Sequence, residues 1–109
     1  MEYRKIGDSD LALSAITFGA WATGGWMWGG IDRQDAIDAI RSSYDSGVTS
    51  IDTAPAYGQG DSEEIVGEAI KDIPRHKVQV LTKYGLRWDL KKGEFYFKSK
   101  NNRGEDIDL

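Results

Sequence analysis

The hydrophobic pattern along the chain contains three short apolar runs that predict buried strands. They cover about 15–19, 48–52 and 78–83, and each is rich in β-branched or aliphatic residues. Their carboxyl ends recur at a nearly even interval, at Gly19, Asp52 and Lys83. Each run is too short for a helix, so strands separated by longer connections are expected.

The segments between these runs carry apolar residues at helical spacing. One helix is predicted over about 33–46, with Asp32 as its N-cap, and a second over about 62–73. Asp61 and Glu64 have the spacing of a capping box at the start of the second helix. The order strand, helix, strand, helix, strand with short joins predicts parallel βα units.

The two ends of the chain have other patterns. Residues 2–13 alternate in polarity around a Gly-Asp-Ser-Asp turn, which predicts a hairpin. Residues 84–109 are predicted to form one long loop, with a hairpin whose strands, 86–90 and 94–97, flank a turn at 91–93. A loop of this length is either a lid over a site or a mobile insertion.

The length of the chain limits what these units can build. With 109 residues there is room for one domain at most. A (β/α)₈ TIM barrel at this interval needs about 250 residues, and a doubly wound sheet could begin in the same way. The expected class is α/β. The periodicity alone does not choose between these two architectures.

Composition excludes several classes of protein. There is no cysteine, so disulfide scaffolds and thiol nucleophiles are excluded. The net charge of −4 argues against a nucleic-acid partner, because neutralising phosphates needs a surplus of lysine and arginine. No apolar run reaches the roughly 18 residues of a membrane span, and residues 1–5 do not resemble a signal peptide. We therefore expect a cytoplasmic location.

Three residues in the predicted βα units suggest a chemistry. Asp52 and Lys83 stand at the carboxyl ends of neighbouring strands, the edge at which parallel α/β folds bind ligands, and Tyr57 follows on the adjoining loop. An ammonium close to a phenol favours the phenolate, which makes the phenol a better proton donor. The trio suits protonation of an oxygen, as in reduction of a carbonyl. A capping Asp, a solvated Lys and a packing Tyr would satisfy the same pattern.

A resemblance favours the catalytic alternative. The sequence resembles the aldo-keto reductase family in the order and spacing of Phe18–Trp21, Ser50–Gly58 (Ser-Ile-Asp-Thr-Ala-Pro-Ala-Tyr-Gly), Ser62–Glu63, Gly67 and Leu81–Lys83. The family implies NADP(H)-dependent reduction of small-molecule aldehydes or ketones on a (β/α)₈ TIM barrel. Residues 1–109 would then be the N-terminal hairpin and the first three βα-type strands of that barrel, which this chain leaves incomplete. If the roles known in the family apply to these positions, Tyr57 would be the proton donor and Lys83 would favour the deprotonated form of Tyr57. Asp52 would pair with Lys83.

The same resemblance implies the surroundings of that trio. Gly19, Ala20 and Trp21, together with Asp52, would lie beside the nicotinamide, and Trp28 would line the substrate cleft with the tyrosine. No metal site is implied.

The fourth catalytic residue of the family, a histidine after the fourth strand, has no counterpart in residues 1–109. His76 precedes the third strand, so we expect it at the opposite end of that strand from Lys83. We expect the 109-residue chain alone to be inactive, and to be ordered with the missing C-terminal part of the barrel or by self-association. A regulatory or redox-sensing subunit of the same family, and a scaffold without catalysis, stay open as alternatives.

Overall fold

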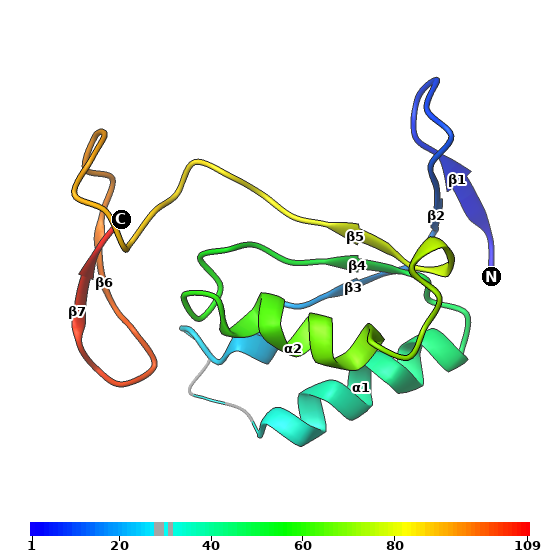
Figure 1. Ribbon diagram of the computed structural model, residues 1–109, viewed down its shortest axis with the longest axis horizontal. Coiled ribbons are helices and arrows are strands. Elements are labelled where there is room, and N and C mark those ends of the chain that lie inside the picture. Colours follow the sequence, from blue (N-terminus) through cyan, green and yellow to red (C-terminus); the bar gives the residue numbers. More distant parts are fainter. Residues whose placement is uncertain (28–29, 31) are drawn as a thin grey trace.

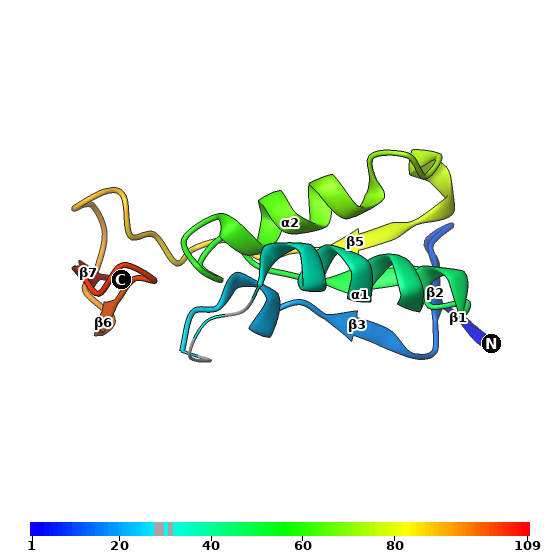
Figure 2. The ribbon, with the colours of Figure 1, turned by 90° about the horizontal axis from the view of Figure 1, so that it is seen from below.

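A three-stranded parallel sheet forms the centre of the computed structural model, which describes residues 1–27, 30 and 32–109. Its strands are β3 (Thr17–Gly19), β4 (Ser50–Asp52) and β5 (Gln79–Leu81), in the order β3-β4-β5. The helices α1 (Arg33–Asp45) and α2 (Asp61–Ile70) cover the same face of this sheet, as Figures 1 and 2 show. The parallel βα arrangement predicted from the sequence is present. No closed barrel forms among the described residues.

The sheet register brings the ends of the strands level with one another. Gly19 is paired with Asp52, and Asp52 with Leu81. The carboxyl ends of all three strands therefore meet at one edge, and Lys83 follows two residues beyond the third. The predicted convergence of Asp52 and Lys83 depends on this register.

The two helices begin differently. Asp32 caps α1 as predicted, with its Oδ1 accepting a hydrogen bond from the backbone N–H of Asp35 at 3.0 Å. The capping box expected at α2 does not form. The residue before α2 is Gly60 in a left-handed conformation (φ 101°), and Asp61 is the first residue of the helix itself. Its carboxylate still suits the positive end of the helix.

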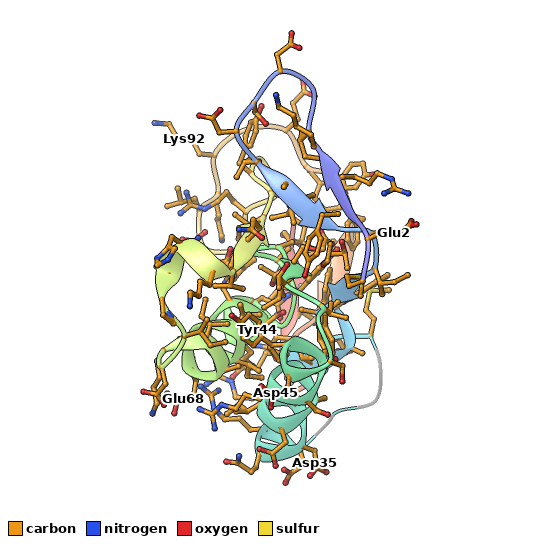
Figure 3. The ribbon with its side chains drawn as sticks, turned by 90° about the vertical axis from the view of Figure 1, so that its right-hand side faces the viewer. Glu2, Asp35, Tyr44, Asp45, Glu68 and Lys92 are labelled. Atoms are coloured by element: carbon orange, nitrogen blue, oxygen red, sulfur yellow. The ribbon has the colours of Figure 1, made fainter. Side chains whose placement is uncertain are left out.

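The core lies between the sheet and the helices. Ile40 of α1, Ile51 of β4 and Val78 before β5 are each 1–2% exposed. Burial of aliphatic side chains of this size stabilises a fold by about 1.5–3 kcal/mol each. The charged side chains Asp35 and Glu68 point away from the sheet on the outer side of the helices (Figure 3). No helix in the described part of the chain is long and apolar enough to cross a membrane.

Two antiparallel hairpins stand at opposite ends of the sheet (Figure 1). At the amino end, β1 (Tyr3–Lys5) pairs with β2 (Ala12–Ser14), so the hairpin predicted over 2–13 forms and extends one residue further, to Ser14. At the carboxyl end, β6 (Lys98–Lys100) pairs with β7 (Asp106–Asp108).

The position of the second hairpin corrects the sequence prediction. A hairpin was expected at 86–97 within a long loop over 84–109, but 86–97 contains no strand. The hairpin forms around Asn101–Glu105 instead, where Asn101 Oδ1 accepts the backbone N–H groups of Arg103 and Glu105, both at 2.9 Å. Opposite charges face each other across it, with Lys100 Nζ 2.7 Å from Asp106 Oδ1.

The described residues also form two 3₁₀ turns, η1 (Ala22–Gly24) after β3 and η2 (Arg75–Lys77) before β5. His76 lies exposed in η2, at the opposite end of β5 from Lys83, as expected.

Candidate active site

The edge where the parallel strands end holds the side chains of Asp52 and Lys83 together. Lys83 Nζ donates to Asp52 Oδ1 at 3.1 Å and to Asp52 Oδ2 at 3.0 Å. It also donates to the backbone carbonyl of Thr53 at 2.9 Å. These acceptors hold Nζ at the ends of β4 and β5.

The charge of Lys83 is set by opposing effects. Partial burial disfavours the ammonium, but the hydrogen bonds and charge of Asp52, together with the Tyr57 hydroxyl, outweigh this, so the pKa of Lys83 is raised above its ordinary value. The side chains of Lys83 and Asp52 are 49% and 41% exposed, so water screens their attraction. The geometry therefore keeps Lys83 positively charged at neutral pH.

The aromatic ring of Tyr57 lies over this ion pair. Lys83 Nζ is 5.0 Å from the centre of the ring. The indole of Trp21 also stacks on this ring, at 5.6 Å between centroids with an interplanar angle of 15°. The loop after β3 and the loop after β4 thus each contribute one ring of a stacked pair, with a cation beside it.

A network of hydrogen bonds between buried hydroxyl and backbone groups lies between α2 and the site. Ser62 Oγ donates to the carbonyl of Ala20 at 2.8 Å and lies 2.9 Å from Thr53 Oγ1. Because the Ser62 proton points to Ala20, Thr53 must be the donor in its contact with Ser62. The backbone N–H of Ala20 donates to the Asp52 carbonyl at 2.8 Å. The chain therefore connects α2 to the ends of both β3 and β4.

The backbones of the two loops also touch directly. A Cβ atom on Gly58 would lie 2.5 Å from the carbonyl oxygen of Gly24, and a Cβ on Gly24 would lie 2.8 Å from the carbonyl oxygen of Tyr57. Gly58 has φ 65°, in the left-handed region. Glycine is needed at both positions, because any larger residue would push the Tyr57 loop away from η1.

The remaining residues proposed for the site differ in accessibility. Gly19 is exposed, and nothing lies within 4 Å of the position its Cβ would take. Trp21 is 38% exposed, whereas Ala20 is fully buried and its backbone groups are bonded within the protein. Trp28 lies outside the described residues.

An apolar cluster next to Tyr57 was not anticipated from the sequence. Trp26, Ala56 and Leu109 are buried together, and Tyr57, Leu86, Trp88, Phe97 and Ile107 pack against them. Trp26 Nε1 donates to the backbone carbonyl of Lys100 at 3.1 Å, which links the segment after η1 to the β6–β7 hairpin. The sequence signal was the concentration of aromatic residues in 84–97, whose partners only the fold reveals.

Comparison with known proteins places these features in a family. The aldo/keto reductase family model matches residues 15–107. Aldo-keto reductase YhdN of Bacillus subtilis (strain 168) is 53% identical over 89 residues, covering 81% of this chain and 27% of that protein. The NADH-specific methylglyoxal reductase of Escherichia coli (strain K12) is 45% identical over 100 residues, covering 90% and 30%. A probable voltage-gated potassium channel subunit beta of Oryza sativa subsp. japonica is 33% identical over 88 residues, covering 81% and 26%.

Solved structures give the same result. The glycerol dehydrogenase AKR11B4 from Gluconobacter oxydans superposes with a TM-score of 0.68 at 47% identity, covering 84% of this chain and 27% of that one. An aldo-keto reductase from Klebsiella pneumoniae in complex with NADPH has a TM-score of 0.57 at 38% identity, covering 67% and 24%. The chain spans less than a third of the length of each of these relatives.

Proposed function

The chain belongs to the aldo/keto reductase family, and from that premise we propose that its protein is an NADP(H)-dependent oxidoreductase that reduces aldehydes or ketones to alcohols. Tyr57 is the proton donor in this proposal. The observation that carries it is the Lys83 ammonium, bound by Asp52 and lying beside the Tyr57 ring.

Charge balance explains why this arrangement suits the reaction. When Tyr57 gives its proton to the carbonyl oxygen, a phenolate forms, and the adjacent positive charge of Lys83 stabilises it. Asp52 keeps Lys83 charged at neutral pH and holds it in place, which the raised pKa of Lys83 supports. The protein's own residues thus supply the proton and compensate the charge that its departure creates.

The described residues also offer a place for a nicotinamide ring. Gly19 has open space where a side chain would stand, and Trp21 keeps part of its ring exposed on the same edge. A flat ring fits such a surface, with Asp52 close by and Ala20 supporting it from the interior. A bound nicotinamide dinucleotide supplies the hydride. Because the names of the relatives include both NADH and NADPH, the two cofactors should be compared directly.

Replacing Tyr57 by Phe tests the proposal, because the variant keeps the stacking on Trp21 and removes only the hydroxyl. In the protein as its gene encodes it, we expect kcat for reduction of a simple aldehyde with NADPH to fall by about 10²-fold or more. Cofactor affinity, measured by fluorescence titration, should stay the same. Tyr3→Phe, in the hairpin at the opposite end of the sheet, is the matched control. Retention of wild-type turnover by Tyr57→Phe would contradict the proposal.

We also propose that the polypeptide of residues 1–109 is inactive by itself, because it presents three parallel strands where a barrel needs eight. NADPH-dependent turnover by a sample whose mass is verified as 109 residues would disprove this.

The relative from rice favours a second candidate, a regulatory or redox-sensing subunit without significant turnover. Such a protein would bind the nucleotide as tightly as a reductase. It would show no consumption of NADPH above the background rate with any aldehyde tested, and Tyr57→Phe would leave that rate unchanged.

A further inference from the structure

Three segments that are distant in sequence meet at the side chain of Asn102, in the turn of the β6–β7 hairpin. Its Nδ2 donates to the carbonyl oxygen of Gly24 in η1 at 2.5 Å and to Asp61 Oδ2 at the start of α2 at 3.0 Å. Both N–H bonds of the amide are thereby used. The side chain bridges the loop after β3 and the loop after β4 from outside the sheet.

The bridge lies at the backbone contact that fixes the Tyr57 loop. A Cβ on Gly58 would be 2.5 Å from the Gly24 oxygen and 3.1 Å from Asn102 Nδ2. The Gly24 carbonyl that Asn102 binds is therefore the same group that packs on Gly58, the residue after Tyr57. Holding this carbonyl in place sets the separation of the two loops, and with it the stacking of Trp21 on Tyr57.

The hairpin turn that carries Asn102 is held by hydrogen bonds of its own. Asn101 Oδ1 closes the hairpin turn through the N–H groups of Arg103 and Glu105. Trp26 Nε1 anchors the first strand of the hairpin through the Lys100 carbonyl at 3.1 Å. The amide of Asn102 is therefore presented from a formed turn, and little ordering is needed for it to bind its two acceptors.

We propose that Asn102 is a positioning residue for the reaction, which sets the place of Tyr57 relative to Lys83 by holding Gly24 and Asp61 together. This inference rests on the proposed function, because it concerns the same tyrosine. Loss of this bridge should lower kcat, because a shift of a reacting group by about 1 Å can reduce the rate by about 10²-fold.

The test compares two neighbouring asparagines in the protein as its gene encodes it. Asn102→Ala removes the bridge, and Asn101→Ala removes the hydrogen bonds of the turn while leaving the bridging amide in place. We expect Asn102→Ala to lower kcat by about tenfold, equivalent to one net hydrogen bond at the transition state, with little change in KM. Asn101→Ala should lower the melting temperature at least as much as Asn102→Ala, because it removes the hydrogen bonds of the turn, but it should lower kcat by less, because the bridging amide is still present.

Two further variants separate positioning from general stability. Asn102→Ser keeps one donor, so its kcat should lie between those of wild type and Asn102→Ala. Asn102→Asp should have the lowest kcat, because a carboxylate would face the Gly24 carbonyl and the Asp61 carboxylate. If Asn102→Ala keeps the wild-type kcat, or if kcat follows melting temperature across all four variants, Asn102 does not position the site. Tyr57→Phe is measured alongside: if it retains activity, the proposed function fails independently of Asn102.

Discussion

Replacing Gly58 by Ala, compared with a control glycine, should separate the energetic cost of a left-handed backbone conformation from that of a steric clash at the candidate site. Gly58 has φ 65°, so any other L-residue is strained there. The added Cβ would also lie 2.5 Å from the carbonyl oxygen of Gly24 and 3.0 Å from Asp61 Cβ. Both atoms belong to or adjoin the backbone, so they cannot rotate away as the end of a flexible side chain could.

The two costs can be estimated separately. A left-handed conformation costs an alanine about 1 kcal/mol. Forcing an additional methyl group into a packed contact adds about 1–3 kcal/mol. The expected loss of unfolding free energy is therefore about 2–4 kcal/mol. Gly7 supplies the control, because its φ is 54° and nothing lies within 4 Å of its Cβ position, so Gly7→Ala should cost about 1 kcal/mol.

Urea unfolding of the two variants and the wild type, followed by circular dichroism, measures both costs. Aldehyde reduction should fall in Gly58→Ala, since relief of the clash moves the Tyr57 loop, and should be unchanged in Gly7→Ala. Equal destabilisation by the two substitutions would show that the contact between Gly58 and Gly24 has no energetic importance, and the account of how the Tyr57 loop is held would then be wrong.

Three other predictions follow from the same site and from α2. Asp52→Asn should lower the pKa of Lys83, since burial then acts without the carboxylate, and an NMR titration of Lys83 Nζ measures it. In the wild type, the pKa of Lys83 is raised above its ordinary value. The stability contributed by the Lys83–Asp52 pair is therefore fully present at neutral pH. It is lost as the pH rises above about 10.4 and through the folded-state pKa of Lys83. Ser62→Ala should destabilise by about 1–3 kcal/mol in thermal or urea unfolding, because it leaves the buried hydroxyl of Thr53 without its acceptor. Gly67→Ala should raise the unfolding free energy by about 0.5–1 kcal/mol, because Gly67 is exposed inside α2 with free space around its Cβ position. Urea unfolding measures this change, and an unchanged unfolding free energy would argue against a regular helix at this position.

The parallel βα order and the meeting of Asp52 with Lys83 could be predicted because both follow from local patterns. Apolar runs of strand length identify the strands, and parallel pairing brings their carboxyl ends together. Neither step needs knowledge of contacts between distant residues.

The hairpin at 98–108 could not be predicted in the same way. Its strands are three residues long and mainly charged, so the short alternation that includes Ile107 and Leu109 is too brief to identify them. Their pairing depends on the Asn101 turn, on cross-strand charge and on the packing of Ile107 and Leu109 against Trp26. The bridge made by Asn102 depends on residues 78 and 41 positions away. Only the folded arrangement brings such partners together.

The charge pairing of this hairpin makes its response to ionic strength different from that of the sheet. Lys100 and Asp106 face each other, as do Lys98 and Asp108, and all four residues are exposed. Exposed charges are screened by dissolved salt, with a Debye length of about 8 Å at 0.15 M, whereas the aliphatic core under α1 and α2 is not. Adding salt should therefore speed amide hydrogen exchange in β6 and β7 while leaving β4 protected. The hairpin that carries Asn102 would then be an element whose local stability depends on the composition of the buffer.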